Sequence, residues 1–196
     1  MAVDIARNAR AKGNHPFGCI LVDDENEHAV IKGGNTAVTT GDATCHAEMM
    51  NVVRMACHHY TEDFRRNCTL YSSAEPCVMC AGAIYWSGIP RVVYALSEYE
   101  LKKFAGGATF DLPCRVVFER GTLEVQVEGP FKVTGMREVH EGFWRQEEGH
   151  FNGPPPANRE ERPRKETMPD RITKAVNKMR LECGFDEVDS GDEGGY

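Results

Sequence analysis

The chain has 196 residues, of which 41% are hydrophobic and 27% charged, and its formal net charge is -7 at pH 7. This length predicts one domain with an appended segment, and no stretch reaches the ~18–20 apolar residues of a membrane-spanning helix. Residues 1–148 carry 15 Lys and Arg against 20 Asp and Glu, so no basic excess marks a surface for a phosphate backbone. The composition favours a soluble protein with a small-molecule substrate over a membrane protein or a nucleic-acid-binding protein.

The first segment alternates apolar and charged residues over positions 1–12, which predicts an amphipathic helix and argues against a secretory signal. Eight cysteines in such a chain predict a reducing, intracellular compartment, with most thiols free. We therefore expect a cytoplasmic location, with the nucleus as an open alternative.

Strands and helices are expected to alternate along the rest of residues 1–148. A β-hairpin is predicted first, with strands at 19–22 and 28–32 around a polar turn. Further strands are predicted at 67–72, 91–95 and 123–127, and helices at 44–58, 77–87, 97–104, 113–119 and 134–147. This alternation predicts an α/β sandwich whose sheet is covered on both faces.

The composition changes after residue 148. A Gly-Pro-Pro-Pro sequence at 153–156 and a Glu/Arg-rich stretch indicate a linker. We therefore predict a domain at 1–148 and a Pro-rich, charged tail at 149–196, with one short helix at 170–183.

Three candidate zinc ligands lie in two short motifs, His46 in H-A-E and Cys77 and Cys80 in P-C-V-M-C. Structural zinc sites have four protein ligands, whereas three protein ligands leave the fourth position open for water. Glu48 follows His46 by two residues, so its carboxylate could transfer the protons of that water without binding the metal. A structural zinc half-site or a redox pair is the alternative for an isolated C-x-x-C, but neither requires the H-x-E motif upstream.

Other side chains are candidates for substrate contacts. Asn35 follows two glycines, where its short amide could reach a base or a ribose or could serve only the turn. Phe17 and Trp86 are aromatic candidates for stacking on a base, and a place in the core is as plausible for Phe17.

The segment from Pro16 to about Trp144 resembles the cytidine deaminase-like superfamily, in the branch of guanine deaminases and tRNA adenosine deaminases. The resemblance is carried by Pro16-Phe17-Gly18, Gly34-Asn35, His46-Ala47-Glu48 and the run E-P-C-V-M-C-A-G-A-I-Y-W that ends at Trp86. It implies a three-layer α-β-α sandwich with a five-stranded mixed sheet, and a homodimer built on the helical faces. It also implies zinc bound by His46, Cys77 and Cys80, Glu48 as the proton shuttle, and substrate contacts from Asn35 and Ala47.

The resemblance also bears on the substrate. The A-I-Y-W sequence resembles guanine deaminases, whereas S-G-I-P-R at 87–91 resembles fungal cytosine deaminases. Asp111 lies in the region where guanine deaminases place an aspartate that reads the substrate, although it could equally cap the helical turns at 113–119.

The expected function is zinc-dependent hydrolytic deamination of a free purine base or nucleoside, with guanine or guanosine favoured and ammonia released. The alternatives are a tRNA adenosine deaminase, a cytosine deaminase, or a non-catalytic, deaminase-like zinc-binding partner subunit. Glu48 favours catalysis, because a non-catalytic subunit would be free to lose it.

Overall fold

The computed structural model describes residues 1–106 and 109–144. Five strands form one sheet: β1 (Gly18–Asp23), β2 (His28–Gly34), β3 (Cys68–Ala74), β4 (Arg91–Leu96) and β5 (Gln126–Glu128). The helices are α1 (Ala2–Ala11), α2 (Ala37–Thr40), the π-helical η1 (Met49–Val53), α3 (Arg54–His59), α4 (Glu62–Arg65), α5 (Val78–Ser87), α6 (Glu98–Ala105) and α7 (Cys114–Glu119). The tail and the helix expected at 170–183 lie outside the described residues.

The strands are ordered β2-β1-β3-β4-β5 in a mixed sheet. β1 pairs antiparallel with β2 and β3, whereas β3, β4 and β5 run parallel. On one face, Leu21, Leu70 and Val92 lie in register across β1, β3 and β4, and all three are fully buried. The prediction of an α/β fold with a five-stranded mixed sheet is confirmed.

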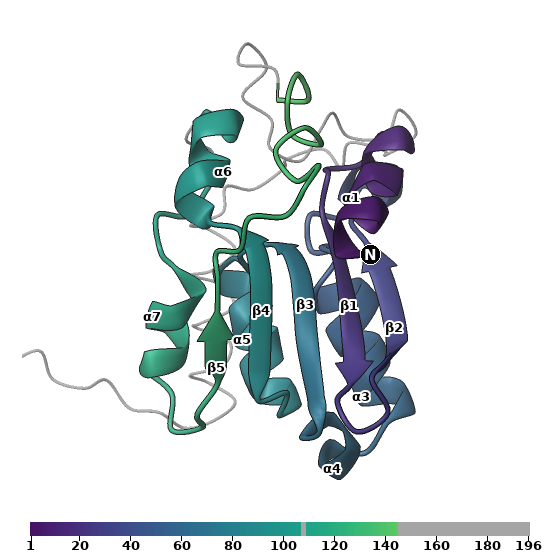
Figure 1. The fold of residues 1–196 in the computed structure, drawn as a ribbon, viewed down its shortest axis with the longest axis vertical. Coiled ribbons are helices and arrows are strands. Elements are labelled where there is room, and N and C mark those ends of the chain that lie inside the picture. Colours follow the sequence, from purple (N-terminus) through teal and green to yellow (C-terminus); the bar gives the residue numbers. More distant parts are fainter. Residues whose placement is uncertain (107–108, 145–196) are drawn as a thin grey trace, which may run out of the picture. The chain divides into compact units, whose positions relative to one another are not determined.

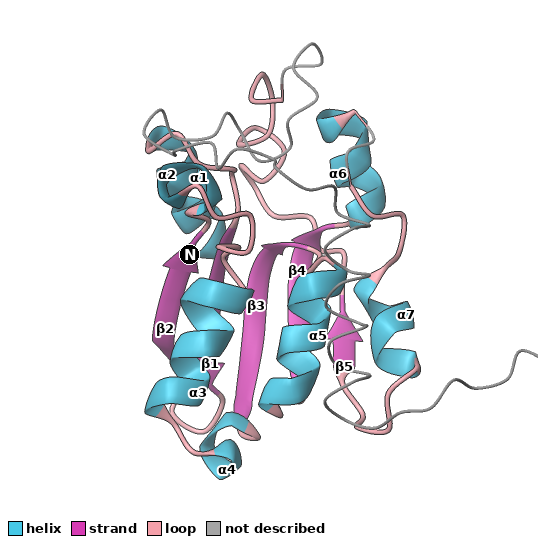
Figure 2. Ribbon diagram, turned by 180° about the vertical axis from the view of Figure 1, so that it is seen from behind, coloured by secondary structure: helices cyan, strands magenta, loops and turns pink. Residues whose placement is uncertain are grey.

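Helices lie on both faces of the sheet. η1 continues into α3, which lies beside α5 on one face (Figure 2), whereas α1 crosses the other face at its upper end (Figure 1). Val52 and Ile84 bring η1 and α5 into the apolar core against the sheet. The parallel strands β3 and β4 end beside the start of α5, and this edge of the sheet is where the chemical motifs meet.

Two glycines allow helices to lie against the edge hairpin. A Cβ atom on Gly18 would meet the carbonyl oxygen of Ala2 at 2.4 Å, and one on Gly33 would meet Asn51 at 2.6 Å. Both distances are shorter than real Cβ contacts, so only glycine lets α1 and η1 approach this closely.

The helix predicted at 134–147 is wrong over the described residues 134–144, which form consecutive turns. Gly135 and Gly142 adopt φ of 81° and 65°, which are left-handed values that interrupt a right-handed helix. Residues 145–147 lie outside the described residues. The turns fold the apolar side chains of this segment back onto the domain without regular backbone hydrogen bonding.

Two other predicted elements begin later than expected. The helix predicted at 44–58 begins at Met49, because residues 42–48 form turns ahead of it. The last strand begins at Gln126 and not at Leu123, since the hydroxyl of Tyr85 accepts the main-chain N–H groups of Thr122 and Leu123. The short helices α2 and α4 were not predicted.

No helix within residues 1–106 and 109–144 is both long enough and apolar enough to cross a bilayer.

We expect Gly18→Ala to destabilise the domain by about 1–3 kcal/mol, since α1 must move away from β1 to admit one methyl group. Gly82→Ala is the matched control, because a Cβ atom at this helical position in α5 has no neighbour within 4 Å. The control should leave stability unchanged or raise it by up to ~1 kcal/mol. Urea unfolding measures both changes, and equal midpoints for the two variants would contradict the proposed close contact.

Candidate functional site: a metal centre at the end of β3

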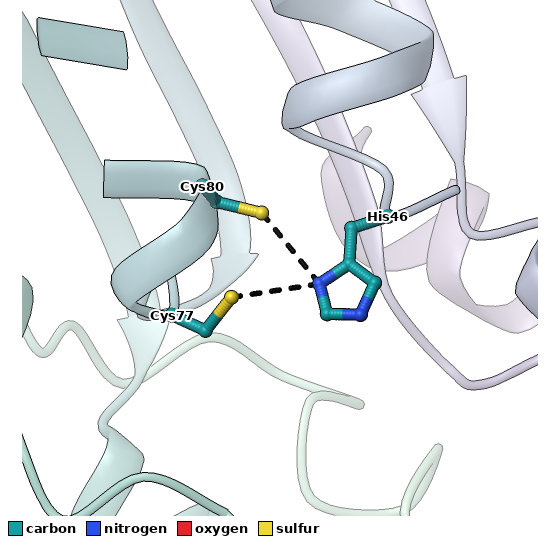
Figure 3. Close-up of side chains that lie close together, drawn as sticks. All are labelled: His46, Cys77 and Cys80. Carbon is teal, nitrogen blue, oxygen red and sulfur yellow. Dashed lines mark hydrogen bonds between the residues drawn. The ribbon is translucent and has the colours of Figure 1, made fainter. Parts of the chain in front are cut away.

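Three metal-ligating side chains converge from two segments of the chain. His46 lies in the turn before η1, and Cys77 and Cys80 lie at the first turn of α5, just after β3. The Nδ1 atom of His46 lies 3.5 Å from the Sγ atom of Cys77 and 3.6 Å from that of Cys80 (Figure 3). The three candidate ligand atoms all lie within 4.8 Å of one another.

This geometry fits a zinc ion. Tetrahedral coordination with Zn–S bonds of ~2.3 Å and Zn–N bonds of ~2.05 Å separates a nitrogen and a sulfur ligand by ~3.6 Å. The observed separations of 3.5 and 3.6 Å match this value. Two thiols and one imidazole form a typical zinc donor set, and three protein ligands leave one coordination position for a water molecule or substrate.

The two thiols differ in protonation. A hydrogen bond from Cys80 is the main cause that lowers the pKa of Cys77 to about 4, with help from His46. The hydrogen bond with Cys77 and burial raise the pKa of Cys80 well above its usual range. Burial alone would lower the pKa of His46, but the hydrogen bond with Cys77, together with the charges of Cys77 and Glu48, raises it. One thiolate therefore already exists at neutral pH, in the form that binds metal.

Glu48 is buried beside the three ligands. The hydroxyl of Ser72 in β3 donates a hydrogen bond of 2.7 Å to its Oε1 atom, while its Oε2 atom lies 3.5 Å from the Sγ atom of Cys80. Burial raises the pKa of Glu48, and the charge of His46 and the hydrogen bond of Ser72 oppose this rise. A raised pKa suits a carboxyl group that must both accept and release a proton near neutral pH.

A π-helical turn follows Glu48. The main-chain N–H group of Val53 donates to the carbonyl oxygen of Glu48 at 2.7 Å, a bond that spans five residues where an α-helix spans four. Such turns are frequent at functional sites. Here the turn begins directly after the carboxylate, so it sets the direction in which His46 and Glu48 enter the site.

Glu75 connects the metal centre to two later helices. Its Oε2 atom accepts the main-chain N–H group of Glu98 at 3.0 Å, and its Oε1 atom accepts that of Cys114 at 3.0 Å. These residues begin α6 and α7, where N–H groups have no partner within the helix and the helix dipole favours a negative charge. One buried carboxylate, two residues before Cys77, therefore fixes both helix starts relative to the site.

Glu98 is a second buried carboxyl group near the centre. Burial raises its pKa to about 7, the Thr109 hydroxyl opposes the rise, and the negative charge of Cys77 adds to it. Nothing in the local sequence pattern singles out Glu98. The burial depends on how α6 packs, which the local pattern does not reveal.

The predicted substrate-binding residues divide into two groups. Phe17, Asn35 and Ala47 are all buried, and the main-chain carbonyl of Phe17 accepts the N–H group of Asn35 at 3.0 Å. The side-chain oxygen of Asn35 accepts the N–H group of Ala37, whereas its Nδ2 atom is buried without a hydrogen-bond partner in the described part of the chain. Asn35 thus serves the turn and still retains an unused donor.

Trp86 and Asp111 do not join this group. Trp86 is 83% exposed near the end of α5, six residues beyond Cys80, which is about 9 Å along a helix axis. The side chain of Asp111 is 78% exposed and accepts a hydrogen bond from Lys102 Nζ at 2.7 Å. Asp111 does not cap α7 either, because the first N–H group of that helix donates to Glu75. Within the described chain, neither residue lies against the metal centre.

Two neighbours of the site, Ser72 and Glu98, were not predicted from the sequence, and neither was the burial of His140 against Phe17. The strand pattern gave no signal for Ser72, because a serine in a buried strand is common without any role. His140 lies in the segment predicted as a helix at 134–147, and its surroundings depend on turns that the periodicity did not predict.

The family model for the cytidine and deoxycytidylate deaminase zinc-binding region matches residues 1–96. A probable cytosine deaminase of Schizosaccharomyces pombe is 38% identical over 147 residues, which are 73% of this chain and 88% of that protein. A tRNA-specific adenosine deaminase of Haemophilus influenzae is 38% identical over 99 residues, covering 50% of this chain and 56% of the relative. A guanine deaminase of Bacillus subtilis is 41% identical over 84 residues, covering 43% and 51%.

Among solved structures, a guanine deaminase from Nitrosomonas europaea superposes with a TM-score of 0.58 at 20% identity, covering 72% of this chain and 80% of that one. This likeness supports the fold.

We expect Cys77→Ala and Cys80→Ala each to lose the zinc that the purified wild-type protein holds at one ion per chain, because two remaining ligands are too few for the site. Cys57→Ala is the matched control, since this exposed thiol lies outside the three-ligand cluster and should leave the zinc content unchanged. Metal analysis by mass spectrometry measures all three, and full zinc in both site variants would exclude these ligands.

Proposed function

Because the chain belongs to the cytidine and deoxycytidylate deaminase family and is therefore a zinc-dependent hydrolytic deaminase, we propose that its substrate is a free purine base or nucleoside, with guanine or guanosine favoured. The observation that carries the deaminase function is the position of Glu48, whose carboxylate is held by Ser72 beside the three-ligand cluster. A structural zinc site would need a fourth protein ligand and no buried carboxyl group.

The proposed roles of the residues follow from their positions. His46, Cys77 and Cys80 hold the metal, which when bound activates water for attack on the ring carbon that carries the exocyclic amine. Glu48 would accept one proton from that water and give it to a ring nitrogen. It would then take the second proton from the hydroxyl group added to the ring carbon and give it to the departing amine, so that ammonia leaves and a ring carbonyl remains. Ser72 holds one carboxylate oxygen in place for these transfers, and burial raises the pKa of the Glu48 carboxyl group, which favours its acceptance of a proton.

Charge and sequence similarity support the substrate proposal. The acidic balance of residues 1–148 disfavours a polynucleotide, and the local identity with the guanine deaminase supports a purine base. Trp86 is exposed, so it gives no support for stacking on a substrate base within its own subunit. The relative from S. pombe favours cytosine as the second candidate, because the likeness covers 88% of that protein.

We also propose that the protein is a homodimer and that it works in a reducing, intracellular compartment. The large exposed surface of Trp86 on α5 supports an interface on this helical face, since exposed aromatic side chains are enriched where proteins associate.

Glu48→Gln should retain zinc and lose activity. The amide preserves the size of the side chain and can still bond to Ser72, but it cannot carry a proton. General acid–base groups commonly contribute ~10²–10⁴-fold, and because this residue serves several steps we expect a loss at the top of that range. Ser72→Ala keeps the carboxylate of Glu48 and removes only the hydroxyl group that donates to it, so the loss of activity should be much smaller. Steady-state ammonia release together with metal analysis tests both, and a zinc-replete Glu48→Gln protein with normal turnover would refute the mechanism.

A substrate panel tests the proposed specificity. Guanine, guanosine, adenine, adenosine, cytosine, cytidine and an unmodified tRNA are each incubated with the zinc-loaded protein, and ammonia or the deaminated base is measured. We expect guanine or guanosine to give the largest kcat/KM. Turnover of cytosine alone would favour the second candidate, and turnover of tRNA alone would refute the free-base proposal while leaving the reaction type intact.

A further inference from the structure

His140 is a buried polar side chain whose hydrogen bonding is incomplete. It is 1% exposed, and its Nδ1 atom accepts a hydrogen bond of 3.3 Å from the indole N–H group of Trp144. Its Nε2 atom is buried and has no hydrogen-bond partner within residues 1–106 and 109–144. Buried polar atoms without a partner are rare in native proteins, and each requires an explanation.

The protonation of His140 follows from its surroundings. Burial, and to a lesser extent the positive charge of Arg10, lower the pKa of His140 to about 4, so the ring is neutral at neutral pH. A neutral imidazole carries one N–H group. Because Nδ1 accepts from Trp144, the proton resides on Nε2, and the unpartnered atom is a hydrogen-bond donor.

Aromatic rings hold His140 in a fixed orientation. Its ring stacks on Phe104 at a centroid distance of 5.8 Å and on Trp144 at 6.0 Å, and it lies 5.4 Å from the ring of Phe17. The imidazole is therefore packed on several sides, and Trp144 also fixes its tautomer. A donor held in this way pre-organises a hydrogen bond at little entropic cost.

The segment that carries His140 lies at the end of the sheet where the metal ligands converge. After β5 the chain crosses the carboxyl ends of β4 and β3, between α6 and α1 (Figures 1 and 2). Phe17, which contacts His140, also accepts the main-chain N–H group of Asn35. The Nδ2 atom of Asn35 is a second buried donor without a partner in the described residues. Two unused donors thus flank Phe17 at this edge.

We infer that His140 is a specificity-determining residue, whose Nε2–H group donates a hydrogen bond to an acceptor on the edge of the substrate base, either O6 or N7 of a guanine-type purine. This inference rests on the proposed function and goes beyond it, because it assigns recognition to the segment after β5. A site built to hydrogen-bond one acceptor discriminates strongly against analogues that lack it, since the buried donor is then left unpaired.

The test compares His140→Phe with the wild-type enzyme on three purines. Guanine carries both acceptors, 2-aminopurine lacks O6, and 7-deazaguanine lacks N7. Phenylalanine keeps the ring in the stack with Phe104 and Trp144 but has no nitrogen. We expect His140→Phe to lower kcat/KM for guanine by roughly 10–100-fold, because the acceptor on the base is then left without its hydrogen bond. The loss of kcat/KM should persist on the analogue that retains the bonded acceptor and disappear on the analogue that lacks it.

Two further variants separate recognition from packing. His140→Gln keeps a donor and an acceptor and should recover part of the guanine activity. Trp144→Phe removes the N–H group that fixes the tautomer and keeps one aromatic ring in the stack, so it should give a smaller loss with the same dependence on the purine. Zinc content and thermal melting are measured for every variant, so that a folding defect is recognised separately.

The outcomes distinguish the two proposals. A His140→Phe protein that loses the same factor on all three purines, or that loses nothing on guanine, overturns the inference and leaves the proposed function intact. A wild-type enzyme that deaminates none of the three purines, and none of the purine bases and nucleosides of the substrate panel, overturns the proposed purine function, and this inference fails with it.

Discussion

A single buried carboxylate holds the active region together. Glu75 uses one oxygen for the first N–H group of α6 and the other for the first N–H group of α7, so both helices are fixed to the loop that enters α5. Hydrogen bonds between a charged group and backbone N–H groups are stronger than neutral ones, and a buried charge is tolerated only where such partners surround it. The starts of α6 and α7 therefore take their places relative to the loop that carries Cys77 into α5.

The metal centre could be predicted from the sequence because its geometry is local. Cys77 and Cys80 lie on one turn of one helix, and the two-residue spacing of His46 and Glu48 places both side chains beside the same strand end. The alternation of strands and helices likewise predicted the sheet, because each strand shows its own pattern of buried residues.

Other parts of the site could not be predicted, because they depend on packing between distant segments. Trp86 belongs to the same sequence motif as Cys80, but it does not lie beside the metal ligands. It follows Cys80 by six residues along α5 and lies on the surface. Ser72 and Glu98 reach the site through tertiary contacts that leave no periodic signal in the sequence. The same holds for the contacts of His140 with Phe17 and Phe104. The apolar spacing after residue 134 suggested a helix, but two left-handed glycines turn the same side chains into the domain by another path.

The contact between Tyr85 and the loop after α7 limits how this family of sequences can vary. The ring of Tyr85 fills the space that a side chain at Gly121 would need, at 2.2 Å from a Cβ atom there, while its hydroxyl accepts the next two N–H groups of the loop. A homologue that has a larger residue at the position of Gly121 must therefore have a smaller or displaced side chain at the position of Tyr85, and the N–H groups of its loop must find other acceptors. The two positions should change together during evolution, although 36 residues separate them and neither touches the metal.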